Sequence, residues 1–153
     1  MEIDLSKAPA LPGVVLDTNA VLDWLVFRDP RAARLVAALE GGAVQWLACP
    51  GMREEFGRTL EYRALTKWAP DRERALTVFD RLHQPCPPPP PTSPTWRCSD
   101  PDDQVFIDLA LARRARWLVT HDRALLRLAR RARAAGVLVL RPGDWPGPAA
   151  VSA

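Results

Sequence analysis

Carboxylates are the side chains of this sequence whose types and spacing could do chemistry. Several of them can share one site in ionised form only if a positive charge neutralises them. Oxygen ligands without His or Cys favour hard cations, Mg²⁺ or Mn²⁺, over zinc. The chain therefore predicts a divalent-metal site if the fold brings its acids together. The candidates form four groups: Asp17; Glu54 and Glu55; Asp100, Asp102 and Asp103; and Asp122.

Alternating strands and helices must position these acids. Apolar runs predict strands at 14–16, 44–48, 117–120 and 137–140. Amphipathic stretches predict helices at 19–27, 30–39, 50–62, 70–82, 101–114 and 123–134. This order is typical of an α/β fold, a three-layer α/β/α sandwich of the Rossmann-like kind with a mainly parallel central sheet. Ligands of such sheets bind at the carboxyl ends of the strands, where all four acidic groups are expected.

Helix periodicity separates the two neighbouring glutamates. Within the expected 50–62 helix, the apolar residues Met52, Phe56 and Leu60 define the buried face. At about 100° per residue, Glu55 lies at the edge of that face and Glu54 points almost directly away from it. Glu55 is therefore preferred as the glutamate of the site, with Glu54 as the alternative.

The same geometry ranks the aspartates of the expected 101–114 helix. Asp103 shares a stripe with Phe106 and Ile107 and so faces inward. Asp102 is intermediate, and Asp108 points elsewhere and is expected in solvent. Asp103 is therefore preferred, with Asp102 as the alternative.

Each aspartate also has a purely structural explanation. Asp100 before Pro101 has the pattern of an N-cap with proline at the first helical position, and this explanation is preferred for it. Asp102 and Asp103 suit the positive end of the helix dipole, and Asp122 could cap the next helix. Asp17 could belong to an ordinary strand-to-helix turn with Thr18 and Asn19. The convergence of four such accidents on one sheet edge is less expected than a shared site.

Four motifs resemble the PIN domain, and within it the toxins of bacterial toxin–antitoxin systems similar to the VapC ribonucleases: VVLDTNAVLDWLVF, EEFGRTL, SDPDDQVFIDLALA and WLVTHDRALL. The resemblance runs from about residue 14 to residue 140. Matched motif by motif, the acidic tetrad of the family corresponds to Asp17, Glu55, Asp103 and Asp122. The residues that support these acids correspond to Thr18, Asn19 and Thr120.

The resemblance implies a metal-dependent endoribonuclease that hydrolyses phosphodiester bonds of single-stranded RNA, acting as the toxin of a toxin–antitoxin pair. One or two Mg²⁺ or Mn²⁺ ions held by the four acids would lower the pKa of a bound water and stabilise charge on the phosphate. The implied partners are the RNA, a cognate antitoxin protein and a second copy in a homodimer. Candidate RNA contacts, for which a solvated helix face is the alternative, are Arg123, Arg127, Arg130 and Arg131.

Two other classes of function compete with the nuclease. The first is a catalytically idle PIN-like module that binds protein or RNA, and metal-dependent cleavage would discriminate against it. The second is a phosphate-transfer protein such as a receiver domain or a haloacid-dehalogenase-type phosphatase. The receiver needs a lysine late in the sheet, and the phosphatase needs D-x-D after its first strand. This chain has only Lys7 and Lys67 and offers Asp17-Thr18-Asn19, so the second class is disfavoured.

The expected organisation is one PIN-like nuclease domain over 13–141, with an N-terminal extension at 1–12 and a flexible tail at 142–153. A proline-rich loop at 85–95, with five consecutive prolines at 87–91, is expected in the polyproline II conformation. His121 stands where the family often has a small residue or arginine, and it is expected in an exposed turn, with contact to metal or substrate as the alternative.

Composition limits the remaining possibilities. A chain that is 48% hydrophobic and 25% charged is not wholly disordered. No apolar run approaches the ~20 residues of a membrane span, and the first residues lack the apolar core of a secretory signal. Three cysteines without CxxC spacing argue against a disulfide scaffold and a zinc site, so a cytoplasmic location is expected. The net charge of +3 is weak evidence for a nucleic-acid partner.

Overall fold

The computed structural model describes residues 11–91 and 96–148, in which five strands form one sheet. The strands are β1 (Gly13–Leu16), β2 (Gln45–Ala48), β3 (His83–Pro85), β4 (Trp117–Val119) and β5 (Leu138–Leu140). Their order across the sheet is β3-β2-β1-β4-β5, and every neighbouring pair is parallel. The expected parallel sheet at the centre of an α/β fold is confirmed.

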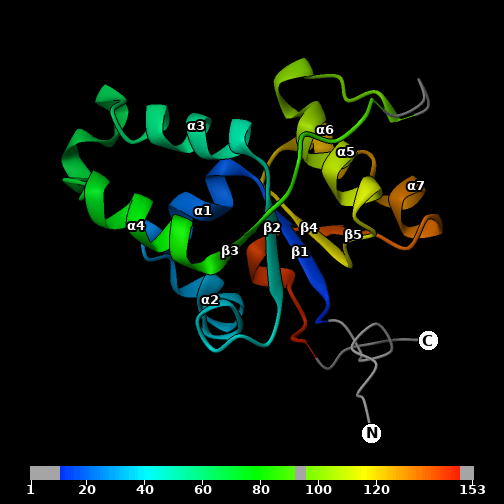
Figure 1. Cartoon of the computed structure of the whole chain (residues 1–153), viewed down its shortest axis with the longest axis horizontal. Coiled ribbons are helices and arrows are strands. Elements are labelled where there is room, and N and C mark those ends of the chain that lie inside the picture. Colours follow the sequence, from blue (N-terminus) through cyan, green and yellow to red (C-terminus); the bar gives the residue numbers. More distant parts are fainter. Residues whose placement is uncertain (1–10, 92–95, 149–153) are drawn as a thin grey trace, which may run out of the picture.

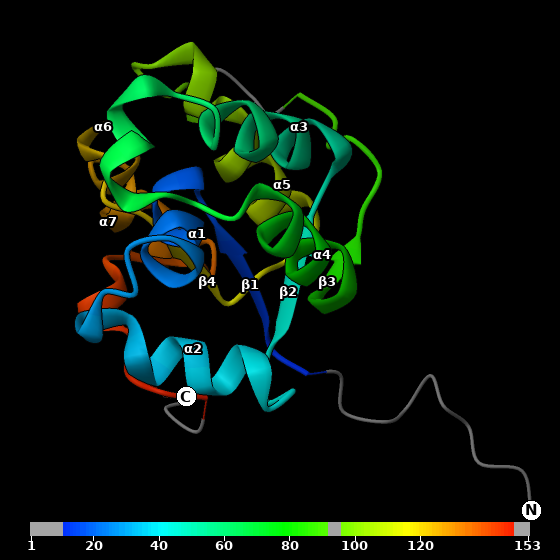
Figure 2. The same ribbon diagram turned by 90° about the vertical axis from the view of Figure 1, so that its left-hand side faces the viewer.

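Helices cover both faces of this sheet. They are α1 (Thr18–Leu25), α2 (Ala33–Glu40), α3 (Pro50–Thr59), α4 (Arg72–Leu82), α5 (Gln104–Ala112), α6 (Arg123–Leu126) and α7 (Ala129–Ala134). Right-handed crossovers put α1–α4 on one face and α5–α7 on the other, on the left and right of Figure 1. In Figure 2, α1 and α2 lie in front of the strands. None of the helices within the described ranges has the length and apolar character needed to cross a membrane.

Large rings join the helical layers to the sheet. Trp46 of β2 and Trp117 of β4 are 2% and 0% exposed, so both belong to the core. Trp46 contacts Trp24 of α1 and Phe79 of α4 edge-on, with ring centroids 5.3 and 4.5 Å apart. These ring contacts hold α1 and α4 against β2. Because α1 begins two residues after β1 ends, they also hold the residues that follow β1.

The edge strand β3 was not predicted. His83–Pro85 has no apolar run, and it becomes a strand because β2 offers a free edge with which it pairs in parallel. The ladder continues one residue further, where the Cys86 amide donates to the Ala48 carbonyl at 2.9 Å. Proline is tolerated at such an edge. Residues 86–91 form neither helix nor strand, and residues 92–95 of the expected polyproline segment lie outside the described residues.

The expected 123–134 helix is two helices, so its prediction as one continuous element was wrong. The amide of Leu128 donates to the carbonyl of Leu125 at 2.9 Å, and this tightened turn separates α6 from α7. Leu125 and Leu128 are both buried. Arg123 therefore lies on α6 and Arg130 on α7, so the arginines proposed to contact RNA do not belong to one continuous helix.

The residues after β5 pack on the domain. Pro142–Asp144 forms a 3₁₀ helix, and Trp145 is 2% exposed. The Trp145 ring meets the Trp117 ring edge-on, with centroids 5.3 Å apart. The first part of the expected flexible tail is therefore held by the core. Residues 149–153 of that tail and residues 1–10 of the N-terminal extension lie outside the described residues.

Candidate metal centre

The order of the strands creates a crevice between β1 and β4. From β1 the chain crosses to β2 on one side, whereas β4 and β5 lie on the other side. Open parallel sheets bind ligands at such a switch point, outside the carboxyl ends of the strands. Asp17 directly follows β1, and Thr120 directly follows β4. The Asp17 amide donates to the Val119 carbonyl at 3.0 Å, which holds the two strand ends side by side.

Thr120 links two of the predicted acids. Its buried hydroxyl donates to Oδ2 of Asp17 and accepts a hydrogen bond from the Asp122 amide at 2.9 Å. The other carboxylate oxygen of Asp17 accepts from the Ala20 amide at 2.8 Å and so caps α1. The helix begins one residue earlier than predicted, at Thr18, because Asp17 is the cap.

Burial dominates the ionisation of Asp17. The residue is 3% exposed, and desolvation raises its pKa from 3.8 to about 6. The hydrogen bonds from Thr120 and Ala20 lower the pKa, but they do not offset the burial. The negative charge of Asp122 adds to the upward shift. A nearby cation would stabilise the ionised form of a carboxylate held in this way.

Three aspartates meet beside it. Asp100, Asp103 and Asp122 each offer a carboxylate oxygen, and these oxygens all lie within 4.8 Å of one another. Asp100 also accepts from the Asp102 amide at 3.0 Å, and Asp122 accepts from the Ala124 amide at 2.7 Å. The capping explanations are therefore correct for both residues, but each cap occupies only one carboxylate oxygen. Capping and clustering are compatible.

Asp103 provides the clearest sign that these residues suit a cation. Its Oδ2 atom is buried and has no hydrogen-bond partner among the described residues. Desolvation raises the pKa of Asp103 from 3.8 to about 8, and the hydrogen bond and charge of Asp122 raise it further, followed by the charges of Asp100 and Asp17. Buried oxygens without partners and mutually repelling carboxylates are the donor set that a hard divalent cation neutralises. The residues present fit such an ion.

Glu55 faces the same region from α3. The Thr18 hydroxyl donates to Oε2 of Glu55 at 3.0 Å. Thr18, Asn19, Glu55 and Asp103 all line one cleft of about 320 Å³. Glu54 is exposed and lines no part of that cleft. The structure thus brings Glu55, and not its neighbour, toward the aspartates.

Gln104 is a positioning residue that sequence reasoning missed. Its side-chain oxygen accepts from the Cys98 amide at 2.6 Å, and its Nε2 donates to the Trp96 carbonyl at 3.0 Å. These bonds hold the segment that leads into Asp100. Nε2 also donates to Oδ1 of Asp108 at 2.9 Å. The expectation of Asp108 in solvent was wrong, because this bond accompanies burial of the residue to 8% exposure.

His121 is also tied into the fold. The residue is only partly exposed, and its Nε2 pairs with Oδ2 of Asp23, a residue of α1 that is 8% exposed. The expectation of a simple exposed turn was therefore wrong. The pair connects the loop that carries Asp122 to α1. No family motif signalled this bond, because the partner lies 98 residues away in the sequence.

The arginines predicted to contact RNA do not gather at one site as the aspartates do. Their side chains are exposed on α6, on the turn after it and on α7, and they stay a prediction: Arg123, Arg127, Arg130 and Arg131.

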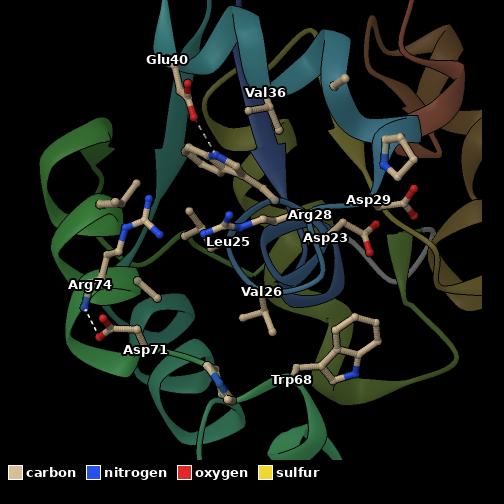
Figure 3. A pocket seen from close by; sticks show the side chains of 17 residues that line it. Asp23, Leu25, Val26, Arg28, Asp29, Val36, Glu40, Trp68, Asp71 and Arg74 are labelled. Atoms are coloured by element: carbon tan, nitrogen blue, oxygen red, sulfur yellow. Dashed lines mark hydrogen bonds between the residues drawn. The ribbon is translucent and has the colours of Figure 1, made fainter.

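A second cleft of about 520 Å³ lies between α1, α2 and α4 (Figure 3). The Trp24 indole donates to Glu40 at 3.3 Å within it, and the Arg74 amide donates to Asp71 at 3.0 Å on the wall that α4 forms. None of the candidate metal ligands lines this cleft. Trp68 stands at its rim.

Replacing Thr120 by valine tests the link between the two strand ends. Valine keeps the shape but leaves Oδ2 of Asp17 and the amide of Asp122 without their partner. The expected loss of stability is about 1–3 kcal/mol, and Mn²⁺ affinity is expected to fall roughly 10- to 100-fold. Thermal denaturation and Mn²⁺ titration measure the two effects. The control is Thr77→Val, whose exposed hydroxyl bonds only the Glu73 carbonyl of its own helix; equal effects in both variants would remove Thr120 from the site.

A comparison with protein-family models identifies this arrangement. The model described as PIN domain matches residues 13–124, from the start of β1 to two residues beyond Asp122. No curated protein matches the chain. PIN domains are generally nucleases, and PIN nucleases generally use divalent metals. Since the match covers most of the sequence and spans every clustered acid, the chain belongs to the PIN domain family.

Proposed function

We propose that this chain is a metal-dependent endoribonuclease that hydrolyses phosphodiester bonds of single-stranded RNA. The observation that carries the proposal is the partnerless, buried Oδ2 of Asp103 inside a cluster of carboxylates. A protein does not retain repelling acids at the ligand-binding edge of its sheet for stability, since each raises the pKa of the next. A divalent cation removes that cost.

The ligands we propose for the ion are Asp17, Asp103 and Asp122, with Glu55 as a ligand or as the group that orients water. When bound, Mg²⁺ or Mn²⁺ supplies an acidified water and neutralises charge that develops on the phosphate. The other groups position these acids. Thr120 holds Asp17 and the backbone before Asp122, and Thr18 holds Glu55. In-line attack of water at phosphorus breaks its bond to the 3′ oxygen and leaves a 3′-hydroxyl and a 5′-phosphate.

We infer from the family resemblance that the enzyme acts in the cytoplasm as the toxin of a toxin–antitoxin pair. A cognate antitoxin protein would restrain it, and a second copy would form a homodimer. Exposed arginines beside Asp122, beginning with Arg123, are proposed to contact the RNA backbone, since guanidinium groups match phosphate geometry. Expression without the antitoxin is then expected to arrest growth, and expression of Asp17→Asn is not.

Cleavage of a mixed-sequence single-stranded RNA by the purified chain tests the proposal. We expect cutting in Mg²⁺ or Mn²⁺ and none in EDTA, with 5′-phosphate ends on the products. Isothermal titration with Mn²⁺ measures binding independently of cutting. A folded chain that binds the ion but does not cut favours the idle binding module. A chain that binds no divalent ion contradicts the metal centre itself.

A further inference from the structure

Exposed aromatic rings gather at one short segment of the chain. Among the large hydrophobic side chains of residues 11–91 and 96–148, the exposed ones are Leu11, Tyr62 and Trp68, at 51%, 56% and 46%. Tyr62 and Trp68 stand at the two ends of the 3₁₀ helix Arg63–Trp68, with Tyr62 as its N-cap. Leu65 of this helix is buried and anchors it to the core. Two exposed rings on one anchored turn indicate a ligand surface.

The rings reach the carboxylate cleft. Tyr62 lines the cleft of about 320 Å³ together with Phe27, Glu55 and Asp103. Trp68 packs edge-on against Phe27, with ring centroids 4.8 Å apart and planes at 61°. Phe27 and Tyr62 line one cleft and Trp68 packs on Phe27, so these three rings, here called the aromatic platform, lead from that cleft to the rim of the larger cleft where Figure 3 shows Trp68.

Basic side chains lie beside the aromatic platform. Nζ of Lys67 lies 5.7 Å from the centroid of the Trp68 ring. Arg63 is exposed at the start of the same 3₁₀ helix. Aromatic rings beside basic groups are typical of surfaces that bind single-stranded nucleic acid, because the rings stack on bases while the cations meet phosphates.

We propose that Phe27, Tyr62 and Trp68 stack on unpaired bases and hold the RNA strand across the carboxylates. The inference rests on the proposed function, since it assigns substrate-positioning residues to the same cleft. Stacking requires bases that are free of pairing, so the platform prefers single strands to duplexes. A protein partner could also cover exposed rings, but it would give no reason for the exposed Tyr62 to line the cleft that contains Glu55 and Asp103.

Fluorescence anisotropy of a labelled single-stranded RNA in EDTA measures the platform without cleavage. Tyr62→Ala and Trp68→Ala are each expected to weaken binding roughly 5- to 100-fold, the equivalent of about 1–3 kcal/mol of stacking. Tyr62→Phe and Trp68→Phe keep a ring and are expected to bind nearly as the unaltered chain does. The control is Leu11→Ala, which removes an equally exposed apolar side chain outside the platform and is expected to change nothing. Circular dichroism checks that each variant is folded.

A duplex of the same sequence provides the second comparison and is expected to bind more weakly than the single strand. Unchanged affinity in both alanine variants overturns the platform and leaves a protein interface as the explanation of the rings. Equal affinity for single strand and duplex, or no RNA binding by the unaltered chain, also overturns it. Failure of the proposed function gives a different result. If the unaltered chain cuts no RNA in Mg²⁺ but the alanine variants still lose RNA affinity, the nuclease proposal fails and the platform stands as the RNA-binding surface of a non-cleaving module.

Discussion

Replacing Asp17 by asparagine is expected to abolish metal-dependent RNA cleavage while the domain stays folded. Asparagine keeps a side-chain oxygen that can cap α1 at the Ala20 amide, but it removes the negative charge. Charge stabilisation by a catalytic divalent ion is worth several kcal/mol, so we expect cleavage to slow about a thousandfold or more. Single-turnover cutting of an end-labelled RNA measures the rate, and Mn²⁺ titration measures the affinity for the ion.

Asp71→Asn is the matched control. Asp71 caps α4 through the Arg74 amide at 3.0 Å, so the substitution makes the same exchange of acid for amide at a helix start away from the cluster. Its cleavage rate is expected to equal that of the unaltered chain. An Asp17→Asn variant that cuts as fast as this control would contradict the proposed role of Asp17.

The adjacent glutamates offer a matched pair for the same assay. Glu55 accepts a hydrogen bond in the carboxylate cleft, whereas Glu54 is exposed. Glu55→Gln is therefore expected to lower the cleavage rate, and Glu54→Gln is included as its control.

Replacing Asp103 by asparagine is expected to stabilise the metal-free domain and to abolish its stabilisation by Mg²⁺. In the folded chain the pKa of Asp103 is about 8, above its ordinary value of 3.8. The folded state thus holds this proton more tightly than the unfolded state does, and its stability falls as the pH rises from about 4 to about 8. Asparagine carries no charge at any pH and can donate to Asp122. Because the side chain is partly solvated, we expect a gain of about 1–2 kcal/mol, or roughly 2–8 °C in Tm, near pH 8.

Thermal denaturation at pH 5 and pH 8, in EDTA and in Mg²⁺, tests this expectation. In EDTA the unaltered chain is expected to melt at a lower temperature at pH 8 than at pH 5. Addition of Mg²⁺ at pH 8 is expected to raise the melting temperature again and so to remove this difference. The curve of Asp103→Asn is expected to be flatter and insensitive to Mg²⁺. Asp102→Asn replaces the exposed neighbour and is expected to shift stability by no more than about 0.5 kcal/mol. Equal melting of Asp103→Asn and the unaltered chain in EDTA would mean that the acids do not repel one another.

Local sequence patterns were sufficient to predict most of the strands and their parallel arrangement. Apolar runs and helical periodicity predicted β1, β2, β4 and β5 and the parallel sheet, because these signals depend on which residues must be buried. β3 escaped prediction because His83–Pro85 owes its conformation to pairing with β2 rather than to its own composition. The separation of α6 from α7 escaped prediction because residues 123–134 contain no Gly or Pro that would mark a break, and the tightened turn between Leu125 and Leu128 shows only in the backbone hydrogen bonds.

The candidate metal centre was likewise predicted only in part. Sequence alone determined that Asp17, Asp103 and Asp122 follow strand ends or begin helices at one edge of the sheet, since strand order and helix period place them there. Only the tertiary structure decided that Asp100 clusters with Asp103 and Asp122, because a capping aspartate looks the same in sequence whether its second oxygen meets solvent or other carboxylates.

Long-range partners were likewise invisible to the sequence. The hydroxyl of Thr120 reaches Asp17 across 103 residues, and His121 reaches Asp23 across 98. The exposed rings of Tyr62 and Trp68 carried no recognisable spacing, and the position of Tyr62 at the carboxylate cleft depends on how the 3₁₀ helix packs against the core through its own buried Leu65. Hydrogen bonds and clefts depend on distances between segments, which residue types and spacing along one chain do not specify.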